Sequence, residues 1–319
     1  MKKIRIKLTN RCNLHCDHCY NTDFGGGDIT DDVFNRIVQC LSIFNSQNDL
    51  ILFHGGEPLI INHHNLKNYI DKIINLNYAY SFCTNLCYRL TQKILDIFTA
   101  AKFIETSWDY KIRFDSRHQK ELWRQNVLLL LSQGVDVRVS VTLTDQLINN
   151  VSPDTLFQMM LNMGVKHILL ERPLPIGRAK TESQLFPYHN KLINYLLQCY
   201  SLSNTTNIKV QLFEDIKMSM QGQYCGCIGR VCHLQQFTFD VDGTLYSCPV
   251  QKQHALGHAE SGINFTKMYN LTHRMHSMPT RCASCSFKCY CKGDCVEFNK
   301  NDICTIKPIY HMMSGLHLY

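Results

Sequence analysis

The sequence contains no apolar run long enough to cross a membrane. A membrane-spanning helix needs about 20 consecutive, mostly apolar residues, and no segment of this 319-residue chain approaches that length. The start of the chain, Met1-Lys2-Lys3, is positively charged, but the apolar core of a signal peptide does not follow it. We therefore expect a cytoplasmic protein without a membrane partner.

Long blocks of basic residues are absent as well. The formal net charge is +7, but Lys and Arg are dispersed, and no basic block is interleaved with aromatic residues as in nucleic-acid-binding segments. Lys3, Arg5 and Lys7 share one face of a predicted strand, which we interpret as a solvated face. The charge pattern therefore predicts no nucleic-acid partner.

Cysteine, in contrast, is abundant. The chain has 17 cysteines, and this odd number, without a signal peptide, argues against a secreted disulfide scaffold. In a reducing compartment thiolates remain available to bind metals. The cysteines concentrate near the N-terminus and in the last third of the chain, which predicts metal binding in both places.

The N-terminal group has the spacing Cys12-x3-Cys16-x2-Cys19 and follows the alternating run of residues 4–8. A [4Fe–4S] cluster is usually bound by four cysteine thiolates. A loop with three thiolates leaves one iron free to bind a ligand that is not protein. A zinc loop and a set of reduced, buried cysteines are the alternative interpretations.

A second motif, Gly-Gly-Glu-Pro at residues 55–58, follows the apolar run of residues 50–53. By itself this tetrapeptide would be a turn. Together with the three-cysteine loop, and with an aromatic residue directly after the last of its cysteines, it makes the sequence resemble the radical SAM enzymes. Two motifs in the right order, each after a predicted strand, favour this interpretation over the alternatives.

The resemblance implies a cofactor and a mechanism. S-adenosylmethionine (SAM) would chelate the open iron, and its reductive cleavage would give a 5′-deoxyadenosyl radical that abstracts hydrogen from a substrate. The residues implied around SAM are Tyr20 near the adenine, Gly55 and Gly56 against the methionyl amine, and Glu57 as the acceptor of a hydrogen bond from that amine.

Apolar runs alternate with amphipathic stretches through the first two-thirds of the chain. Strands are predicted at residues 2–8, 50–54, 79–83, 102–107, 135–141 and 166–171, and helices at 31–44, 66–75, 91–100, 119–131, 153–163 and 188–200. Thr30 and Ser152 have the character of helix N-caps. This is an α/β pattern with a parallel sheet, and the resemblance implies a (β/α)6 partial TIM barrel with chemistry at the carboxyl ends of its strands.

Polar residues follow several of the predicted strands. Thr84 and Asn85 resemble family positions near SAM. Ser107 and Asp109 resemble a Ser-x-Asp-Gly segment that contacts the ribose, although Tyr110 replaces the glycine. Arg178 belongs to a Pro-x-Gly-Arg-Ala segment and would face the substrate or the SAM carboxylate, with an ordinary loop arginine as the alternative.

The last third of the chain contains Cys232-x10-Gly243-x4-Cys248, then Cys282-x2-Cys285-x5-Cys291-x3-Cys295, then Cys304. This spacing resembles the seven-cysteine pattern of the SPASM domain, which we expect at residues 208–319 after a barrel at residues 1–207. That resemblance implies two auxiliary [4Fe–4S] clusters, and thus three clusters in total. A β-hairpin around Asp242-Gly243 would open the domain, and zinc is the alternative metal. The implied ligands are Cys232, Cys248 and Cys295 with Cys225 or Cys227 for the first cluster, and Cys282, Cys285, Cys291 and Cys304 for the second.

The remaining cysteines and two histidines have less specific surroundings. Cys40 and Cys199 lie in helical apolar patterns and are most simply core residues. Cys87 and Cys289 are candidate hydrogen-atom donors, with an inert thiol as the alternative for each. His15 and His18 lie between cluster ligands, and we interpret both as solvated loop residues.

The resemblance favours a maturase of ribosomal peptides that forms a crosslink or thioether or epimerises a residue. Its partners would be a precursor peptide, an electron donor of the flavodoxin or ferredoxin type and, because the chain begins at the first barrel strand, a separate leader-binding protein. Alternatives are a small-molecule enzyme such as an aminosugar dehydrogenase or epimerase, a sulfatase-type maturase, and a non-enzymatic electron-transfer or metal-binding module. The sulfatase-type alternative is weakened because Pro249, not an acid, follows Cys248.

Overall fold

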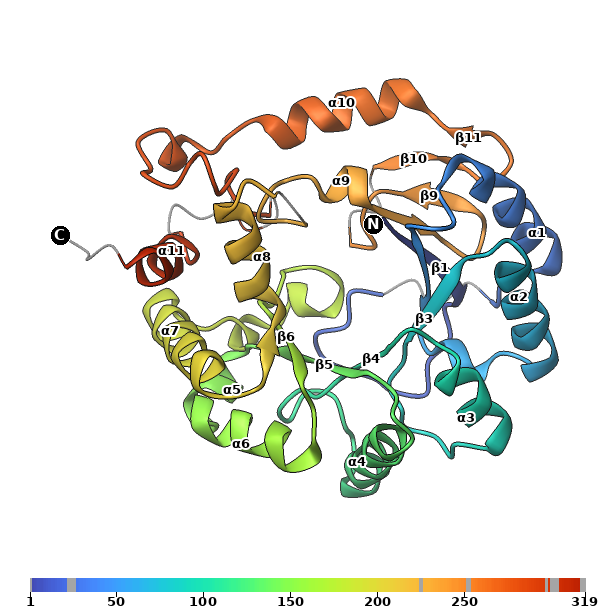
Figure 1. The fold of residues 1–319 in the computed structure, drawn as a ribbon, viewed down its shortest axis with the longest axis horizontal. Coiled ribbons are helices and arrows are strands. Elements are labelled where there is room, and N and C mark those ends of the chain that lie inside the picture. The colour runs from blue at the N-terminus through green and yellow to red at the C-terminus, as the bar shows by residue number, and fades with distance from the viewer. Residues whose placement is uncertain are drawn as a thin grey trace.

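The computed structural model describes residues 2–21, 27–223, 226–250, 254–295, 298 and 304–315. Its core is a ring of parallel strands that opens on one side (Figure 1). The strands are β1 (Lys3–Thr9), β2 (Leu50–Gly55), β3 (Ala79–Cys83), β4 (Ile104–Ser107), β5 (Val137–Thr142), β6 (His167–Glu171) and the short β7 (Lys209–Val210), each parallel to the next. This confirms the predicted α/β class with a parallel sheet.

Helices lie outside this ring (Figure 1). They are α1 (Asp31–Cys40), α2 (His63–Asn75), α3 (Gln92–Thr99), α4 (Arg117–Ser132), α5 (Asp145–Asn150), α6 (Pro153–Met163) and α7 (His189–Thr205), with short 3-10 turns at Leu41–Ile43, Pro58–Ile60, Gly177–Lys180 and Ser183–Leu185. The predicted caps are confirmed: Thr30 accepts a hydrogen bond from the Val33 amide and Ser152 from the Thr155 amide. The sequence missed α5, which is too short for a clear period.

Side chains alternate between the two faces of each strand. Ile4, Ile6 and Leu8 are buried in the main hydrophobic core. The opposite face of β1 is not solvated, contrary to our interpretation of its basic residues. Lys7 is buried and contacts Asn21 at 2.7 Å and Asp240 at 3.2 Å, and burial lowers the pKa of Lys3. The basic face of β1 therefore lines the lumen of the barrel.

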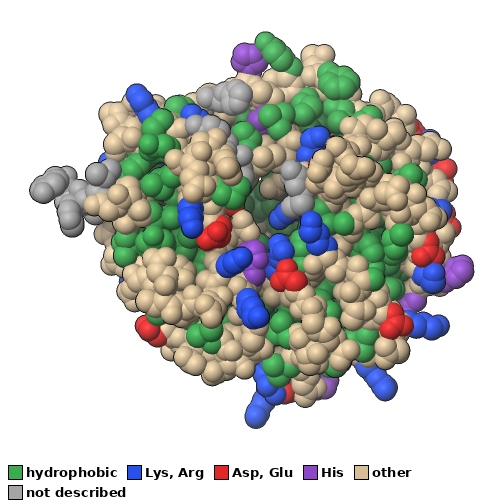
Figure 2. Space-filling model, in the orientation of Figure 1, with side chains coloured by type: hydrophobic (Ala, Val, Ile, Leu, Met, Phe, Trp, Pro, Cys, Tyr) green, Lys and Arg blue, Asp and Glu red, His purple; other side chains and the backbone are tan. Residues whose placement is uncertain are grey.

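The lumen is open to solvent. Glu171, at the carboxyl end of β6, is exposed, yet the surrounding protein raises the pKa of its carboxyl, and the nearby Glu105 adds to this effect. Glu171 is therefore accessible to solvent while protein surrounds it on several sides, as expected for a side chain in a cavity that opens to solvent. Figure 2 shows a hollow near the centre of the visible face, and charged and histidine side chains gather beside it.

The last third of the chain continues the same sheet. The hairpin of β8 (Gln236–Phe239) and β9 (Thr244–Tyr246) forms around Asp242-Gly243 as predicted, and β8 pairs in parallel with β1. Beyond it lie β10 (Ala255–His258) and β11 (Gly262–Ile263), which gives the strand order β11-β10-β9-β8-β1-β2-β3-β4-β5-β6-β7. The cysteine-rich region is thereby joined to the barrel by backbone hydrogen bonds.

Four helices accompany these strands: α8 (Gln211–Met220), α9 (Cys232–Gln235), α10 (Phe265–His276) and α11 (Lys307–Ser314), with a 3-10 turn at Thr280–Cys282. Residues 209–220, which we expected in the second domain, form β7 and α8 and pack against β6. The α11 helix packs on α7. None of the helices in the described part of the chain is long and apolar enough to span a membrane.

Candidate functional site

The loop after β1 carries Cys12, Cys16 and Cys19, all of them partly buried. Its backbone turns at the last two cysteines, where the Cys19 amide donates to the Cys16 carbonyl at 3.2 Å. Burial raises the pKa of Cys16 to about 11, and the nearby Cys19 and Cys12 sulfurs add to this effect. The three sulfurs are therefore close enough to interact electrostatically. Burial likewise raises the pKa of Cys12. Burial therefore disfavours the thiolate forms of Cys12 and Cys16, which a bound metal would stabilise at neutral pH.

The end of β2 is pressed against this loop. The Gly56 amide donates to the Thr9 carbonyl at 2.8 Å, and the Glu57 amide donates to the Arg11 carbonyl at 2.9 Å. A Cβ atom on Gly55 would lie 2.3 Å from the Thr9 oxygen, and one on Gly56 would lie 2.1 Å from the Arg11 oxygen. The close approach to the loop that carries Cys12, Cys16 and Cys19 thus requires glycine at both positions, and their contact with SAM stays a prediction.

Glu57 is completely buried and binds protein donors through both carboxylate oxygens. Oε1 accepts from the Leu59 amide at 3.1 Å and from the Thr84 hydroxyl at 2.8 Å, and Oε2 accepts from the Asn85 amide at 2.7 Å. Burial raises the pKa of Glu57 to about 7, although these hydrogen bonds oppose the shift. In this structure Glu57 therefore fixes the ends of β2 and β3 to each other.

Asn85 continues this connection to the cluster loop. Its side-chain nitrogen Nδ2 donates to Asn13 Oδ1 at 2.6 Å and lies 3.7 Å from Cys12 Sγ. Asn13 in turn donates to the Cys87 carbonyl at 2.9 Å. Thr84 and Asn85 thus lie beside the first cluster cysteine, at the edge where the sequence placed them.

Asp109 supports the loop from the β4 side. Its side chain is fully enclosed, and Oδ1 accepts from the Thr142 amide at 2.7 Å while Oδ2 lies 2.6 Å from Arg113 Nε. Burial acts to raise the pKa of Asp109, but Arg113, His18 and the Thr142 hydrogen bond outweigh it and lower the pKa. Both oxygens are thus engaged by protein groups in this structure, whereas the half-buried Ser107 stands on the lumen face of β4.

His18 belongs to this buried group, which corrects our interpretation of it as solvated. Its Nε2 lies 3.4 Å from Asp109 Oδ2, and its side chain is 16% exposed. Burial lowers the pKa of His18, although Asp109 opposes this effect. Arg113 was missed by the sequence analysis, because nothing in a loop sequence shows that an arginine four residues after an aspartate turns inward to pair with it.

The segment after β6 holds the other side of the cluster loop. The Arg178 amide donates to the Cys19 carbonyl at 3.0 Å, and its guanidinium donates to the Cys16 carbonyl and contacts His15, both at 3.1 Å. Gly177 has φ +57°, and a Cβ there would lie 2.2 Å from the Cys19 oxygen. Arg178 therefore anchors the loop. Tyr20 is surrounded by protein, and burial raises its pKa, with smaller contributions from Cys83, Cys19 and Cys248.

Four cysteines of the C-terminal region meet near the lumen. Cys227 is hydrogen-bonded through sulfur to Cys232 and Cys295. The bond to Cys232, burial and the nearby Cys248 raise the pKa of Cys227 well above its usual range, although the bond to Cys295 opposes this shift. Cys225, the other candidate at this position, lies outside the described residues.

A second group of four surrounds a small cavity of about 20 Å³. The cysteines lining it are Cys282, Cys285, Cys291 and Cys304, with Phe287 and Tyr310 among the remaining lining residues. Burial raises the pKa of Cys291 to about 12. In the described part of the chain no His, Cys, Asp and Glu side chains are close enough together to hold a single metal ion. The four sulfurs of a cubane site bind separate iron atoms, so they stand farther apart.

The two candidate hydrogen-atom donors differ in their surroundings. Cys87 is buried in the main core, and its sulfur lies 3.4 Å from the Asn85 carbonyl and 3.7 Å from that of Gln119, at the start of α4. Cys289 is exposed in the cysteine-rich region. Cys87 lies next to Asn85 and close enough to Cys12 and Cys16 to interact electrostatically with them, and its role as a hydrogen-atom donor stays a prediction.

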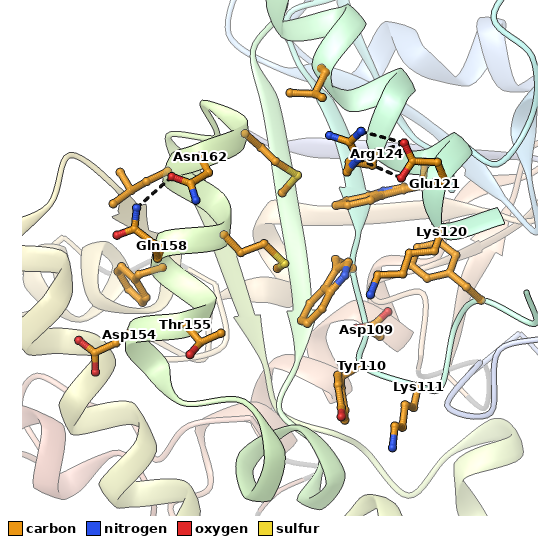
Figure 3. Close-up of a pocket in the computed structure, with 18 of the residues that line it drawn as sticks. Asp109, Tyr110, Lys111, Lys120, Glu121, Arg124, Asp154, Thr155, Gln158 and Asn162 are labelled. Atoms are coloured by element: carbon orange, nitrogen blue, oxygen red, sulfur yellow. Dashed lines mark hydrogen bonds and ion pairs between the residues drawn. The ribbon is translucent and has the colours of Figure 1, made fainter. Parts of the chain in front are cut away.

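A groove of about 1290 Å³ lies on the outer side of the barrel, between α4 and α6 (Figure 3). Lys120, Glu121 and Arg124 stand along one wall, and Gln158 and Asn162 along the other. Because helices flank it, this groove is separate from the lumen. Asp109 and its neighbours in the loop after β4 also line this groove.

Comparison with known proteins agrees with this geometry. A family model described as a 4Fe-4S single cluster domain matches residues 5–128. The fold is similar to that of the anaerobic sulfatase-maturating enzyme anSMEcpe, solved with bound AdoMet and the Cp18Cys peptide, with a TM-score of 0.82, 16% identity, and coverage of 98% of this chain and 97% of that chain. It is also similar to Streptococcus suis SuiB bound to its precursor peptide SuiA, with a TM-score of 0.67, 13% identity, and coverage of 93% and 72%.

Two curated sequences are also similar. An uncharacterized protein of Methanocaldococcus jannaschii is 26% identical over 216 residues, which cover 61% of this chain and 71% of that protein. A probable GTP 3′,8-cyclase of Methanocella arvoryzae is 39% identical over 62 residues, 19% of this chain and 20% of that protein, so this match spans about a fifth of each. The chain therefore has the fold of the radical SAM/SPASM structures, as the sequence predicted, and its residues 5–128 are similar to a 4Fe–4S single cluster domain.

Proposed function

We propose that this protein is a radical SAM enzyme that abstracts hydrogen from a peptide. The observation that carries the proposal is the cluster loop, in which three interacting thiols and no fourth cysteine are held by the ends of β2, β3, β4 and β6. Cys12, Cys16 and Cys19 would hold a [4Fe–4S] cluster. With SAM bound, this cluster supplies the electron that generates a 5′-deoxyadenosyl radical.

The protein residues position this chemistry. Glu57, Thr84 and Asn85 hold the β2 and β3 ends next to Cys12, and Asp109 with Arg113 supports the loop near Cys16. The resemblance also implies Tyr20, Ser107 and Arg178 as residues of this site. Their contacts with SAM belong to the proposal.

Two further clusters would be held by the grouped cysteines of the last third. We assign Cys227, Cys232, Cys248 and Cys295 to one, and Cys282, Cys285, Cys291 and Cys304 to the other. The first assignment uses Cys227 rather than Cys225 because Cys227 contacts Cys232 and Cys295. Zinc in these positions would need a more compact set of ligands than the described residues provide.

A peptide substrate is supported by the enclosed but open lumen and by the two neighbours of similar fold, both solved with peptides. A precursor peptide would enter the lumen, helped by a leader-binding protein, and a flavodoxin- or ferredoxin-type protein would supply electrons. A sulfatase-type reaction is less favoured, since Pro249 stands where that resemblance requires an acid.

Anaerobic incubation of the reconstituted protein with SAM and dithionite tests the proposal. We expect 5′-deoxyadenosine from the wild type and none from the variant with Cys12, Cys16 and Cys19 all changed to Ala. Cys40→Ala, at the buried C-terminal end of α1, is the matched control and should retain cleavage. Absence of 5′-deoxyadenosine from an iron-loaded wild type would instead favour an electron-transfer module.

A further inference from the structure

Arg230 is a charged residue to which the sequence analysis gave no role, and the structure buries it almost completely. It lies between Cys227 and Cys232 in the sequence and is 1% exposed. A guanidinium is not deprotonated in proteins, so a full positive charge lies inside the cysteine-rich region. Burial of such a charge is costly unless an anion compensates it.

The Arg230 guanidinium binds the segment that carries the second set of cysteines. Its Nε donates to the Asp294 carbonyl at 2.9 Å, and Nη2 donates to the Gly293 carbonyl at 3.3 Å. Nη1 donates to the Met275 carbonyl at 3.2 Å and to the Ser277 carbonyl. These carbonyls lie on both sides of the segment that holds three cysteines of the second set. Arg230, itself part of the segment of the first set, therefore connects the two sets.

The backbone has an unusual conformation on both sides of this contact. The angle φ is +50° at Arg230, +62° at Asp294 and +105° at Gly293, and residues other than glycine rarely adopt a positive φ. A Cβ on Gly293 would lie 3.0 Å from Arg230 Cζ and 2.9 Å from Pro279 Cδ. Such conformations persist where the surrounding structure enforces them, often at functional sites. The fold thus holds the guanidinium against a loop that only glycine allows to come so close.

The carbonyl groups satisfy the hydrogen-bond donors of Arg230 but do not neutralise its charge. Within the residues that the structure describes, Arg230 forms no ion pair with Asp or Glu. The carboxylate of the neighbouring Asp294 is bound by Arg172 instead, at 2.6 Å. The guanidinium is therefore a buried cation whose counter-charge is not a carboxylate of these residues.

The cysteine sulfurs of both sets are the anions closest in character to this missing counter-charge. Cys282 and Cys291 of the second set and Cys295 of the first are close enough to interact electrostatically with Arg230. Four thiolates around a [4Fe–4S] core of charge about +2 give an anion of charge about −2. Two such clusters, held by the cysteines assigned above, would supply the negative charge that Arg230 lacks.

From these contacts we propose that Arg230 is the shared counter-charge of the two auxiliary clusters and raises the reduction potential of both. The inference rests on the proposed function, because it needs the two clusters assigned there. Uptake of one electron from a reductant changes the charge of such a cluster from about −2 to about −3, with no proton bound or released. A fixed cation stabilises the more negative form more, and burial protects this interaction from screening by water and salt. Arg230 therefore favours electron uptake by both clusters.

A redox titration with dithionite, followed by EPR spectroscopy of the reconstituted full-length protein, tests this role. All samples carry Cys12→Ala, Cys16→Ala and Cys19→Ala, so that only the auxiliary clusters contribute signals, and this form is the parent protein. Arg230→Gln removes the charge but keeps a hydrogen-bond donor, whereas Arg230→Lys keeps the charge. Lys288→Gln is the matched control, because Lys288 also lines the cavity of the second set but is exposed.

We expect the reduction equilibrium of both clusters to become at least tenfold less favourable in Arg230→Gln than in the parent protein. For a one-electron couple, a tenfold change lowers the potential by about 59 mV. Arg230→Lys should remain close to the parent, because it restores the charge. Lys288→Gln should shift the potentials far less than Arg230→Gln, since water screens an exposed charge.

Unchanged potentials in Arg230→Gln would overturn the proposal. Equal shifts in Arg230→Gln and Arg230→Lys would overturn it as well, because they would show that hydrogen-bond geometry and not charge matters. A shift confined to one cluster would contradict a charge shared by both.

Iron content decides the case in which a variant does not retain its clusters. Loss of iron from Arg230→Gln alone would support a counter-charge that the clusters require. Loss from both variants, or from Arg230→Lys alone, would leave Arg230 a purely structural role and overturn the proposal. A parent protein that binds zinc, or that gives no cubane signal after reconstitution, would instead refute the auxiliary clusters of the proposed function.

Discussion

Arg172 and Asp294 form a doubly hydrogen-bonded ion pair between the end of β6 and the cysteine-rich region. Arg172 Nη1 lies 2.6 Å from Asp294 Oδ2, Nη2 lies 2.8 Å from Oδ1, and the two side chains are 9% and 5% exposed. The pair joins segments that are far apart in the sequence. Asp294 directly precedes Cys295, so the ion pair positions a proposed cluster ligand.

Removal of one partner should be costly. Asp294→Ala leaves the Arg172 charge buried and unpaired, so we expect a loss of about 3–5 kcal/mol in the free energy of unfolding. Glu121→Ala is the control, because it breaks the exposed ion pair with Arg124 and should barely change the denaturation midpoint. Adding Arg172→Met to Asp294→Ala should recover part of the loss. An equal loss of unfolding free energy in Asp294→Ala and Glu121→Ala would show that the buried ion pair stabilises the fold no more than the exposed one.

Gly177 tests the contact between the β6 segment and the cluster loop. Gly177→Ala should displace the loop at Cys19 and reduce iron in the N-terminal cluster, because its new Cβ would collide with the Cys19 carbonyl. Gly222→Ala is a matched control, since Gly222 also has a positive φ, +78°, but no atom lies within 4 Å of its Cβ position. Iron analysis and SAM-cleavage assays should therefore separate the two variants. Identical iron content in both would refute the steric explanation.

Glu57 should make stability depend on pH. Its folded pKa of about 7 lies above the ordinary value of 4.5, so the stability it contributes is fully present below pH 4.5 and is lost as the pH rises through 7. Glu57→Gln does not titrate. It also presents an NH2 group to one of the donors that now bind the carboxylate, which should cost about 1–3 kcal/mol.

Denaturation of both proteins between pH 5.5 and 8.5 measures this difference. We expect the advantage of the wild type over Glu57→Gln to shrink as the pH rises. A pH-independent difference would mean that Glu57 is already ionised throughout this range. SAM affinity measured on the same samples reports whether the Thr84–Asn85 segment has shifted.

Cys225 and Cys227 can be distinguished by iron content. Three cubanes predict about twelve iron atoms per chain, and Cys227→Ala should lower this number because Cys227 contacts Cys232 and Cys295. Cys225→Ala should retain it. The reverse result would reassign the first auxiliary cluster.

Cys295 and Cys304 should belong to different clusters although they are nine residues apart. Cys304 lines the cavity with Cys282, Cys285 and Cys291, whereas Cys295 contacts Cys227. Each Ala variant should therefore lose one cluster and keep the other, which anomalous iron scattering from crystals would show. Both sulfurs on one cubane would contradict this division.

The sequence by itself determined the strands, the order of the motifs and the sets of cysteines. Apolar runs, caps and the spacing of Cys12, Cys16 and Cys19 are local features, and each is readable without knowing what lies opposite. The β8–β9 hairpin around Asp242-Gly243 was predictable for the same reason. The short α5 helix was not, because six residues show no clear period.

Only the tertiary structure decided which face of each strand is inside. A period of two marks two faces but does not say which one the closing sheet encloses. Lys3, Arg5 and Lys7 therefore looked like a solvated face and proved to line the lumen. The reasons for Gly55, Gly56 and Glu57 also lie in partners distant in sequence. Curvature and register of the whole sheet bring those partners together, and no local pattern encodes them.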